Sequence, residues 1–371
     1  MSIIKQKVIN DKRLDYIDSL RGLAVLMVVL VHVSQIADMS NFNSIIQKIF
    51  SDGAKGVQLF YIISGFTIWL SIYKISIKNT YSYKNFMIRR FFRIAPMWYM
   101  AIIVYLLIDG TGARYWLGDV QNISILNIIF NFIFLHGFNP YYINSIVPGG
   151  WSIGVEMVFY VIAPLLYKYC NSTDLSIKMF ALSLILGKGL GKILLHICPI
   201  GSQELWSNYL FFWLPSQLPY FFIGITLFNC IYKKDRLLSK GSYMCLIAVL
   251  AVLYLAPDSV TSSAILLAGL FIVYSKGSII VLNNSIMQYV GKLSYSVYLT
   301  HFIAIKIATK ISIPIFIPNN LIQVIVNYTL VVLIAICISS ITYYCIEQPM
   351  INWGRKLEIP YNNRKIETTI L

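Results

Sequence analysis

Long apolar stretches recur along the whole chain of 371 residues and constrain its fold more than any other feature. A helix needs about 20 apolar residues to cross the roughly 30 Å hydrocarbon core of a bilayer. Hydrophobic residues make up 58% of the sequence and charged residues only 12%, which excludes an ordinary soluble domain. We therefore expect an all-α polytopic membrane protein. The expected spans are residues 17–37, 54–73, 94–108, 151–169, 177–197, 209–232, 243–256, 262–274, 286–307 and 321–346.

The formal net charge of +15 is concentrated in short loops between these stretches. Lysine and arginine accumulate in cytoplasmic loops, where they face anionic lipid, so this charge does not indicate nucleic-acid binding. Three basic segments are therefore expected to be cytoplasmic: the loop with Lys74, Lys78, Lys84, Arg89, Arg90 and Arg93, the loop with Lys233, Lys234, Arg236 and Lys240, and the tail with Arg355, Lys356, Arg364 and Lys365.

Residues 123–136 form a marginal apolar segment. Whether this segment crosses the membrane decides on which side the later loops and the tail lie. If the segment crossed the membrane, the second basic loop and the tail would both lie outside. It is shorter than the roughly 20 residues a span needs, and Asn127 and Asn131 lie one turn apart within it. We predict about ten transmembrane helices plus this one re-entrant segment, with both termini cytoplasmic.

One membrane-embedded domain, residues 1–371, accounts for the whole chain. Residues 1–16 are expected to be a cytoplasmic N-terminus, residues 17–346 the transmembrane bundle and residues 347–371 a cytoplasmic tail. The first apolar run is too long for a cleavable signal peptide and no small-residue cleavage site follows it. The six cysteines form no CxxC pair, so they indicate neither a metal site nor a disulfide framework.

Arg21 and His32 lie eleven residues apart in the first apolar run. At about 100° per residue they share one face of a helix, separated by roughly 16 Å along its axis. Ionisable groups inside a membrane usually face a protein interior or a water-filled cavity. The alternative is an arginine that snorkels to lipid headgroups and a histidine that only packs. The shared face favours a site.

Arg90 and Arg93 are three residues apart on one face of the helix that begins the third span. Planar guanidinium groups suit phosphate oxygens, so a phosphorylated cofactor from the cytoplasm would fit here. The alternative is an ordinary positive-inside anchor that binds lipid headgroups.

Two further segments place polar groups inside apolar runs. Glu156 follows Trp151 and Ser152 just inside the fourth span, where a carboxylate is costly unless it is paired. Tyr298 and His301 lie three residues apart in a span that also contains several serines. The alternatives are a structural pair for Glu156 and a packed histidine. Counting about 1.5 Å per residue puts His32, His301 and Glu156 in one layer, roughly 22 Å above the cytoplasmic face.

At these residues the chain resembles the acyltransferase-3 family of integral membrane acyltransferases. The resemblance covers nearly the whole chain and rests on six motifs in the family's order. They are Asp18-Ser-Leu-Arg21-Gly-Leu-Ala with His32, Gly56-Val-Gln-Leu-Phe-Tyr-Ile-Ile-Ser64-Gly65-Phe66, Arg90-Phe-Phe-Arg93-Ile-Ala-Pro96, Trp151-Ser152-Ile-Gly-Val-Glu156, Ser294-Tyr295-Ser-Val-Tyr298-Leu-Thr-His301 and Ile346-Glu347-Gln-Pro349. Gln58 departs from the pattern, because many relatives have an acidic residue there.

The resemblance implies transfer of an acyl group, most often acetyl, from acyl-CoA to a hydroxyl of an envelope glycan. It implies acetyl-CoA as a co-substrate, no permanently bound cofactor and no metal, and a location in the bacterial cytoplasmic (inner) membrane. The acceptor would be an O-antigen, capsule or exopolysaccharide, or its lipid-linked repeat.

Roles for the site residues follow from this resemblance together with general chemistry. His32 is expected to be the general base or a transient acyl carrier, because histidine titrates near neutral pH. Glu156 or His301 would orient or assist it. Three residues are expected to support the site (Trp151, Ser152 and Tyr298), and three to bind the donor (Arg21, Arg90 and Arg93).

Two other functions remain open from the residues alone. A transporter or flippase for a glycan or a small anionic substrate would also place Arg, His and Glu in a cavity. A regulatory or structural subunit could keep the fold without activity. Hydrolysis of acetyl-CoA or release of CoA by the purified protein would separate the enzyme from both.

Overall fold

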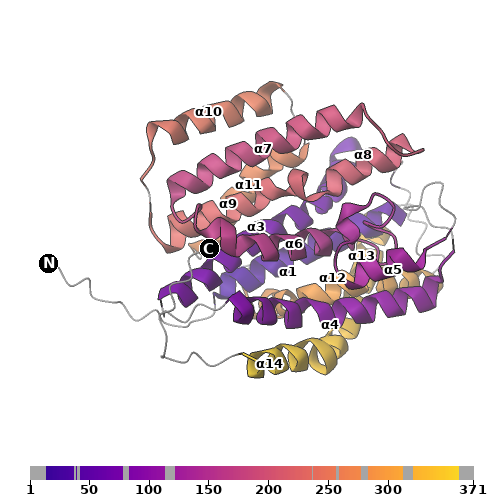
Figure 1. Ribbon diagram of the computed structural model, residues 1–371. Coiled ribbons are helices and arrows are strands. Elements are labelled where there is room, and N and C mark those ends of the chain that lie inside the picture. The colour runs from indigo at the N-terminus through magenta and orange to yellow at the C-terminus, as the bar shows by residue number, and fades with distance from the viewer. Residues whose placement is uncertain are drawn as a thin grey trace.

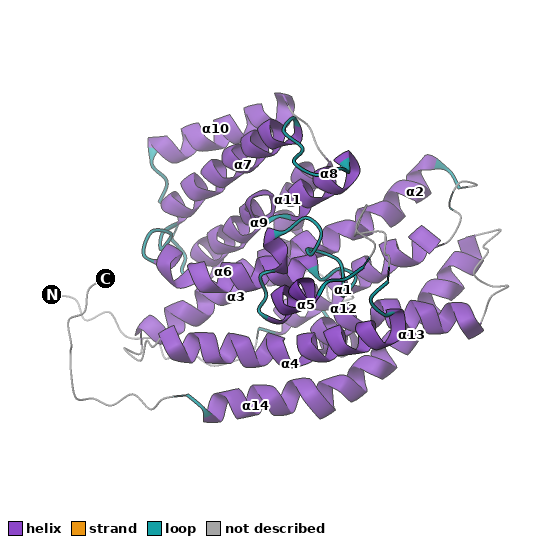
Figure 2. Ribbon diagram, turned by 45° about the vertical axis from the view of Figure 1, so that its right-hand side comes forward, coloured by secondary structure: helices purple, strands orange, loops and turns teal. Residues whose placement is uncertain are grey.

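A computed structural model describes residues 14–36, 39, 42–77, 83–112, 122–235, 237–255, 259–276, 283–311 and 321–358. Within this part of the chain the regular elements are all helices, joined by loops (Figures 1 and 2). The expected all-α fold is confirmed. The N-terminal basic residues, Lys78, Arg236 and the end of the tail lie outside the described residues.

Each expected span coincides with one helix or with two or three consecutive helical elements. Among the described residues, five helical stretches are long and apolar enough to cross a membrane by length and composition. The elements are α1 (Asp15–Ile36), α2 (Ser44–Ser51), η1 (Asp52–Lys55), α3 (Gly56–Ile77), α4 (Tyr83–Asp109), α5 (Ile125–Phe132), η3 (His136–Phe138), α6 (Trp151–Tyr167), α7 (Thr173–Leu195), α8 (Gln203–Phe212), α9 (Leu214–Leu227), η4 (Phe228–Tyr232), α10 (Lys240–Leu255), α11 (Ser259–Ser275), α12 (Ser285–Ile311), α13 (Leu321–Thr342), η5 (Tyr343–Glu347) and α14 (Gln348–Lys356). The count of ten crossings stays a prediction.

The basic segments gather at one end of the bundle. Arg89, near the start of α4, donates to Glu358 beyond the end of α14 at 3.4 Å. At the ends of α3 and η4, the rings of Tyr73 and Tyr232 lie 6.1 Å apart. Ser71 of α3, Arg89 of α4 and Arg355 of α14 also line one cavity. The ends of α3, η4 and α14 therefore lie beside the start of α4, which agrees with the predicted placing of the basic segments on one side. That this end faces the cytoplasm stays a prediction.

The segment between α4 and α6 contains only short helical elements. Its longest helix, α5, has eight residues and is therefore about 12 Å long, too short to cross a roughly 30 Å core. Asn127 and Asn131 of α5 are buried, and Ser145 donates to Asn127 at 2.8 Å. The segment therefore packs against the bundle, and its expected re-entry into the membrane without a full crossing stays a prediction.

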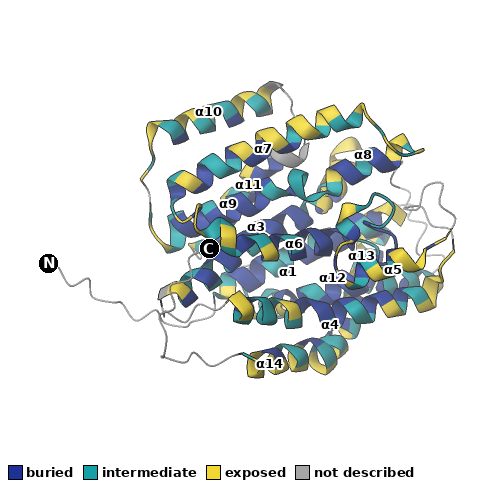
Figure 3. Ribbon diagram, in the orientation of Figure 1, coloured by how far each residue is buried: buried dark blue, intermediate teal, exposed yellow. Residues whose placement is uncertain are grey.

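Helix α1 lies in the centre of the bundle and packs against α12 and α3 (Figure 1). A Cβ atom added at Gly291 of α12 would lie 1.7 Å from the carbonyl oxygen of Asp18. Only glycine permits this approach, which resembles the small-residue contacts of membrane helices. Buried residues are concentrated on α1, α3, α6 and α12, whereas α10 and the outer face of α7 are largely exposed (Figure 3).

Candidate active site

A strongly basic cavity of about 450 Å³ lies at the end of the bundle where the basic segments gather. Six cationic side chains and two acidic ones line it, which leaves a formal excess of four positive charges. The cations are Arg21, Arg89, Arg90, Arg93, Lys292 and Arg355, and the acids are Asp18 and Glu347. Because guanidinium groups can bind two phosphate oxygens each, the cavity suits a ligand with several phosphates.

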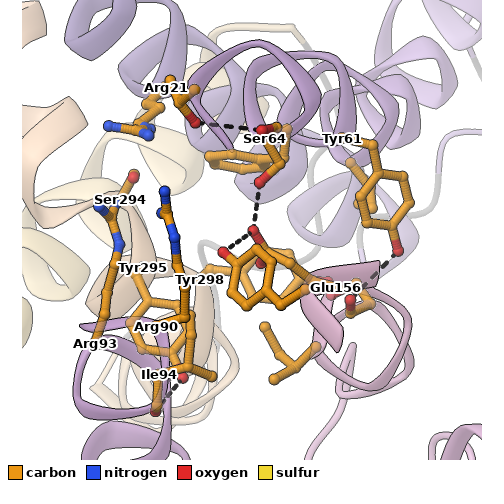
Figure 4. Close-up of a pocket in the computed structure, with 16 residues that line it drawn as sticks. Arg21, Tyr61, Ser64, Arg90, Arg93, Ile94, Glu156, Ser294, Tyr295 and Tyr298 are labelled. Atoms are coloured by element: carbon orange, nitrogen blue, oxygen red, sulfur yellow. Dashed lines mark hydrogen bonds between the residues drawn. The ribbon is translucent and has the colours of Figure 1, made fainter. Parts of the chain in front are cut away.

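A much smaller cavity, about 70 Å³, continues from the basic one into the middle of the bundle. Arg21, Arg90 and Arg93 line both cavities. Figure 4 shows their guanidinium groups on one side of the small cavity, with Ser64 and Glu156 on the other. The small cavity therefore forms a narrow passage beyond the basic one.

Glu156 is held by two hydroxyl donors in the narrow passage. The Ser64 hydroxyl of α3 donates to its carboxylate, as does the Tyr160 hydroxyl, one turn along α6, at 2.5 Å. The Arg90 guanidinium lies 5.3 Å from the centre of the Tyr160 ring. The half-buried carboxylate is thus compensated by two hydrogen bonds, and a cation lies over the ring of one of the two donors.

A third cavity, about 860 Å³, occupies the other end of the bundle and contains His32. Val57 and Tyr298 line both this outer cavity and the narrow passage. Its wall combines polar groups with large aromatic rings. The polar residues include Gln35, Asp52, Lys55, Gln58, Asp109, Asn144 and Asn208, and the aromatic ones Trp151, Phe211, Phe212, Tyr298 and Phe302. Such a mixture suits a sugar, which has apolar faces and hydroxyl edges.

His32 and His301 lie side by side, although they come from the first and the twelfth helix. Their ring centres are 5.2 Å apart, and the Phe302 ring packs against both. The Nδ1 atom of His32 lies 2.9 Å from Oε1 of Gln35. Nδ1 of His301 lies 2.6 Å from the Tyr298 carbonyl oxygen. Because both of these oxygens are acceptors, each Nδ1 donates, and in the neutral imidazole Nε2 then keeps the lone pair.

The start of α6 is tied to α12 by a small hydrogen-bond network. The Tyr298 hydroxyl donates to the Gly149 carbonyl at 2.9 Å. The Ser152 hydroxyl lies 2.8 Å from the Tyr298 hydroxyl. Trp151 is buried and packs against Phe212, with ring centres 4.4 Å apart. The three expected supporting residues therefore border the outer cavity or the narrow passage.

The expected single layer of His32, His301 and Glu156 is wrong for Glu156. The two histidines lie together, but Glu156 lines the narrow passage with Arg90 and Arg93. Among the described residues its side-chain partners are Ser64 and Tyr160. The depth estimate failed because α6 begins inside the bundle, after a segment that is itself packed against α12.

Several residues of these cavities were not singled out from the sequence. Ser64 and Glu347 stood inside the family motifs without a role, and Tyr160 follows Glu156 at a spacing of four residues that places both on one helix face. Gln35 follows His32 by three residues, a spacing that could have indicated their contact. Arg355 was named only as a basic residue of the tail and Lys292 not at all, because only the tertiary fold brings them to the arginines.

Comparisons with known proteins agree with the expected resemblance. The family model for the acyltransferase domain matches residues 14–344. The chain is also 25% identical, over 320 aligned residues, to the exopolysaccharide production protein ExoZ of Rhizobium meliloti (strain 1021). The alignment covers 82% of this chain and 92% of that protein. No solved structure matches the chain.

Proposed function

The chain belongs to the acyltransferase-3 family, and from that premise we propose that it transfers an acetyl group from cytoplasmic acetyl-CoA to a hydroxyl of an envelope glycan. The observation that supports the proposal most is the series of three adjoining cavities. A basic cavity, a narrow passage and a polar aromatic cavity follow one another through the bundle. The series fits a phosphorylated donor at one end and a sugar at the other.

The donor would bind with its phosphates among Arg21, Arg90 and Arg93. Its slender pantetheine arm would extend through the narrow passage past Glu156 and bring the thioester to Tyr298, where the passage meets the outer cavity. Holding both reactants at this junction supplies the proximity that a two-substrate transfer needs.

His32 would act as the general base at that junction. Its Nε2 would accept the proton of the acceptor hydroxyl while the hydroxyl oxygen attacks the thioester carbonyl carbon. The carbon–sulfur bond then breaks, and the CoA thiolate leaves and takes up the proton from His32. Gln35 would keep the proton on Nδ1, so that the base presents the lone pair of Nε2.

The acceptor we propose is an exopolysaccharide or its lipid-linked repeat, and the location is the bacterial inner membrane. The name of the similar exopolysaccharide production protein supports this class of acceptor. An O-antigen or a capsule has the same hydroxyl chemistry.

The test uses purified full-length protein in nanodiscs with radiolabelled acetyl-CoA and a surface glycan that lacks O-acetyl groups. We expect label in the glycan and one CoA thiol released per acetyl transferred, with no transfer by the His32→Gln variant. Uptake of glycan or of an anionic substrate into vesicles, without CoA release, would contradict the proposal and indicate a transporter. If the protein shows neither acetyl transfer nor uptake, the result would also contradict the proposal and indicate a regulatory or structural subunit.

A further inference from the structure

The two oxygens of the Glu156 carboxylate have different surroundings. Oε1 accepts both hydroxyl donors, from Ser64 of α3 and from Tyr160 of α6, and Ser64 and Glu156 face each other across the narrow passage (Figure 4). Oε2 has no hydrogen-bond partner among the described residues, yet it is not sealed within the bundle. Because Glu156 lines the narrow passage, Oε2 is the oxygen that a molecule in the passage can reach.

The arginines of the passage do not occupy this oxygen. Arg21, Arg90 and Arg93 line the same space, but in the described part of the chain none of them forms an ion pair with Glu156. Arg21 instead lies 3.5 Å from Asp18. The guanidinium groups therefore remain available for phosphate oxygens. A carboxylate can only accept hydrogen bonds, so the group that meets Oε2 must be an N–H or O–H donor.

The position of Glu156 along α6 indicates which donor it can meet. Ser152 lies at the outer end of the passage, 2.8 Å from the Tyr298 hydroxyl. Glu156 follows four residues later, about 6 Å further along the helix. Pantetheine has two amide N–H groups, and the nearer one is separated from the sulfur by two methylene groups, about 4 Å. With the thioester at Tyr298, this amide lies beside Glu156, whereas the hydroxyl of the arm lies closer to the phosphates.

We propose that Oε2 of Glu156 accepts a hydrogen bond from the pantetheine amide that is nearer the thioester. Glu156 is then a donor-binding residue that sets the depth of the thioester, and it takes no part in proton transfer with His32 or His301. The Ser64 and Tyr160 hydroxyls hold the carboxylate so that Oε2 faces the arm. This inference rests on the proposed function, because it takes acyl-CoA as the donor.

Glu156→Gln changes the atom that the arm meets and keeps the shape of the side chain. Because the Ser64 and Tyr160 hydroxyls need an acceptor, they hold the amide oxygen at the Oε1 position, and the amide nitrogen replaces Oε2. This nitrogen cannot accept the pantetheine N–H. We expect the affinity for CoA to fall about tenfold or more, the scale of a hydrogen bond to a charged group. The affinity for the adenosine bisphosphate part of CoA, which lacks the arm, should stay unchanged. Isothermal titration calorimetry on the purified full-length protein measures both.

A CoA analogue with an ester oxygen in place of the nearer amide N–H makes the same test on the native protein. This measurement remains decisive if the Glu156→Gln variant does not fold. The native protein should bind the analogue about tenfold more weakly than CoA, and the Glu156→Gln variant should bind both alike. Thr67→Val, a change in the wall of the same passage, is the matched control and should keep the native preference for CoA.

Unchanged CoA affinity in the Glu156→Gln variant, or equal native affinity for CoA and its ester analogue, would overturn the inference. Loss of acetyl transfer in that variant without loss of CoA affinity would also overturn it and indicate a catalytic role. A native protein that shows the expected affinities but transfers no acetyl group to the glycan would refute the proposed function alone. Acetyl transfer with no preference for CoA over the ester analogue would refute the contact with Glu156 alone.

Discussion

His32 of α1 and His301 of α12 lie with their ring centres 5.2 Å apart, and each ring has its Nδ1 held by an oxygen acceptor. The contact joins helices that are far apart in the sequence and pack closely through Gly291. His301 is fully buried, whereas His32 lines the outer cavity. Of the two, His32 is therefore the histidine that an acceptor hydroxyl can reach.

Replacing Arg90 and Arg93 with alanine is expected to weaken acetyl-CoA binding at least about tenfold, because charge-assisted hydrogen bonds to phosphate are lost. Lysine at both positions should restore binding only partly, since an ammonium group cannot form the same bidentate contacts. Isothermal titration calorimetry measures the affinity. Lys84→Ala, an exposed position on the same helix, is the control, and unchanged affinity in the double alanine variant would make these arginines mere anchors.

The Gly291→Ala substitution is expected to destabilise the protein by about 3 kcal/mol, because the new Cβ would lie 1.7 Å from the Asp18 carbonyl oxygen. Gly189→Ala on α7 is the matched control, since nothing lies within 4 Å of a Cβ there. That control should be neutral or stabilise by up to about 1 kcal/mol. Thermal unfolding in detergent compares them, and equal melting temperatures would contradict the close packing of α1 on α12.

Cysteine labelling tests which end of the bundle faces the cytoplasm. In a variant without the six native cysteines, Lys234→Cys should resist a membrane-impermeant reagent added to intact cells, and Phe138→Cys should react. Both native side chains are exposed, so burial does not prevent labelling. The opposite pattern would reverse the predicted orientation.

Gln35 is expected to matter through its hydrogen bond to Nδ1 of His32. Gln35→Leu removes the acceptor and should slow acetyl transfer about tenfold, the scale of one such bond, while donor binding stays unchanged. Gln35→Glu keeps an acceptor oxygen at this position and should retain most of the rate. Transfer rates and donor affinities are measured for both variants side by side. Equal losses of transfer rate in the two variants would contradict a role for the hydrogen bond to His32.

Local periodicity was enough to predict the shared face of Arg21 and His32, because α1 is one uninterrupted helix. It also predicted that residues 123–136 are too short to cross; the helix found there, α5, has eight residues, and the absence of a crossing stays a prediction. The depth of Glu156 could not be predicted in this way. The segment before α6 is bound to α12 through the Gly149 carbonyl and Tyr298, and counting residues from the membrane surface does not detect such a packed segment.

Contacts between helices were the other part that the sequence did not predict. The Ser64–Glu156 pair joins α3 to α6, and the Gln58–Gln217 pair joins α3 to α9. Such pairs depend on helix rotation and register, and hydropathy carries no information about either. The family motifs contain most of the residues that line the narrow passage, but fewer than half of those that line the basic cavity or the outer cavity. They did not indicate which of these residues would meet.

The acetyl transfer rate of the His32→Gln variant tests the central claim most directly. Glutamine keeps a hydrogen-bonding group of similar reach but cannot accept a proton near neutral pH. General base catalysis accelerates a reaction about 10²–10⁴-fold. The transfer rate of the variant should therefore fall at least about 100-fold, while the protein inserts normally and binds acetyl-CoA with native affinity. A correctly inserted His32→Gln protein that retained more than about a tenth of the native rate would contradict the assignment of His32 as the base.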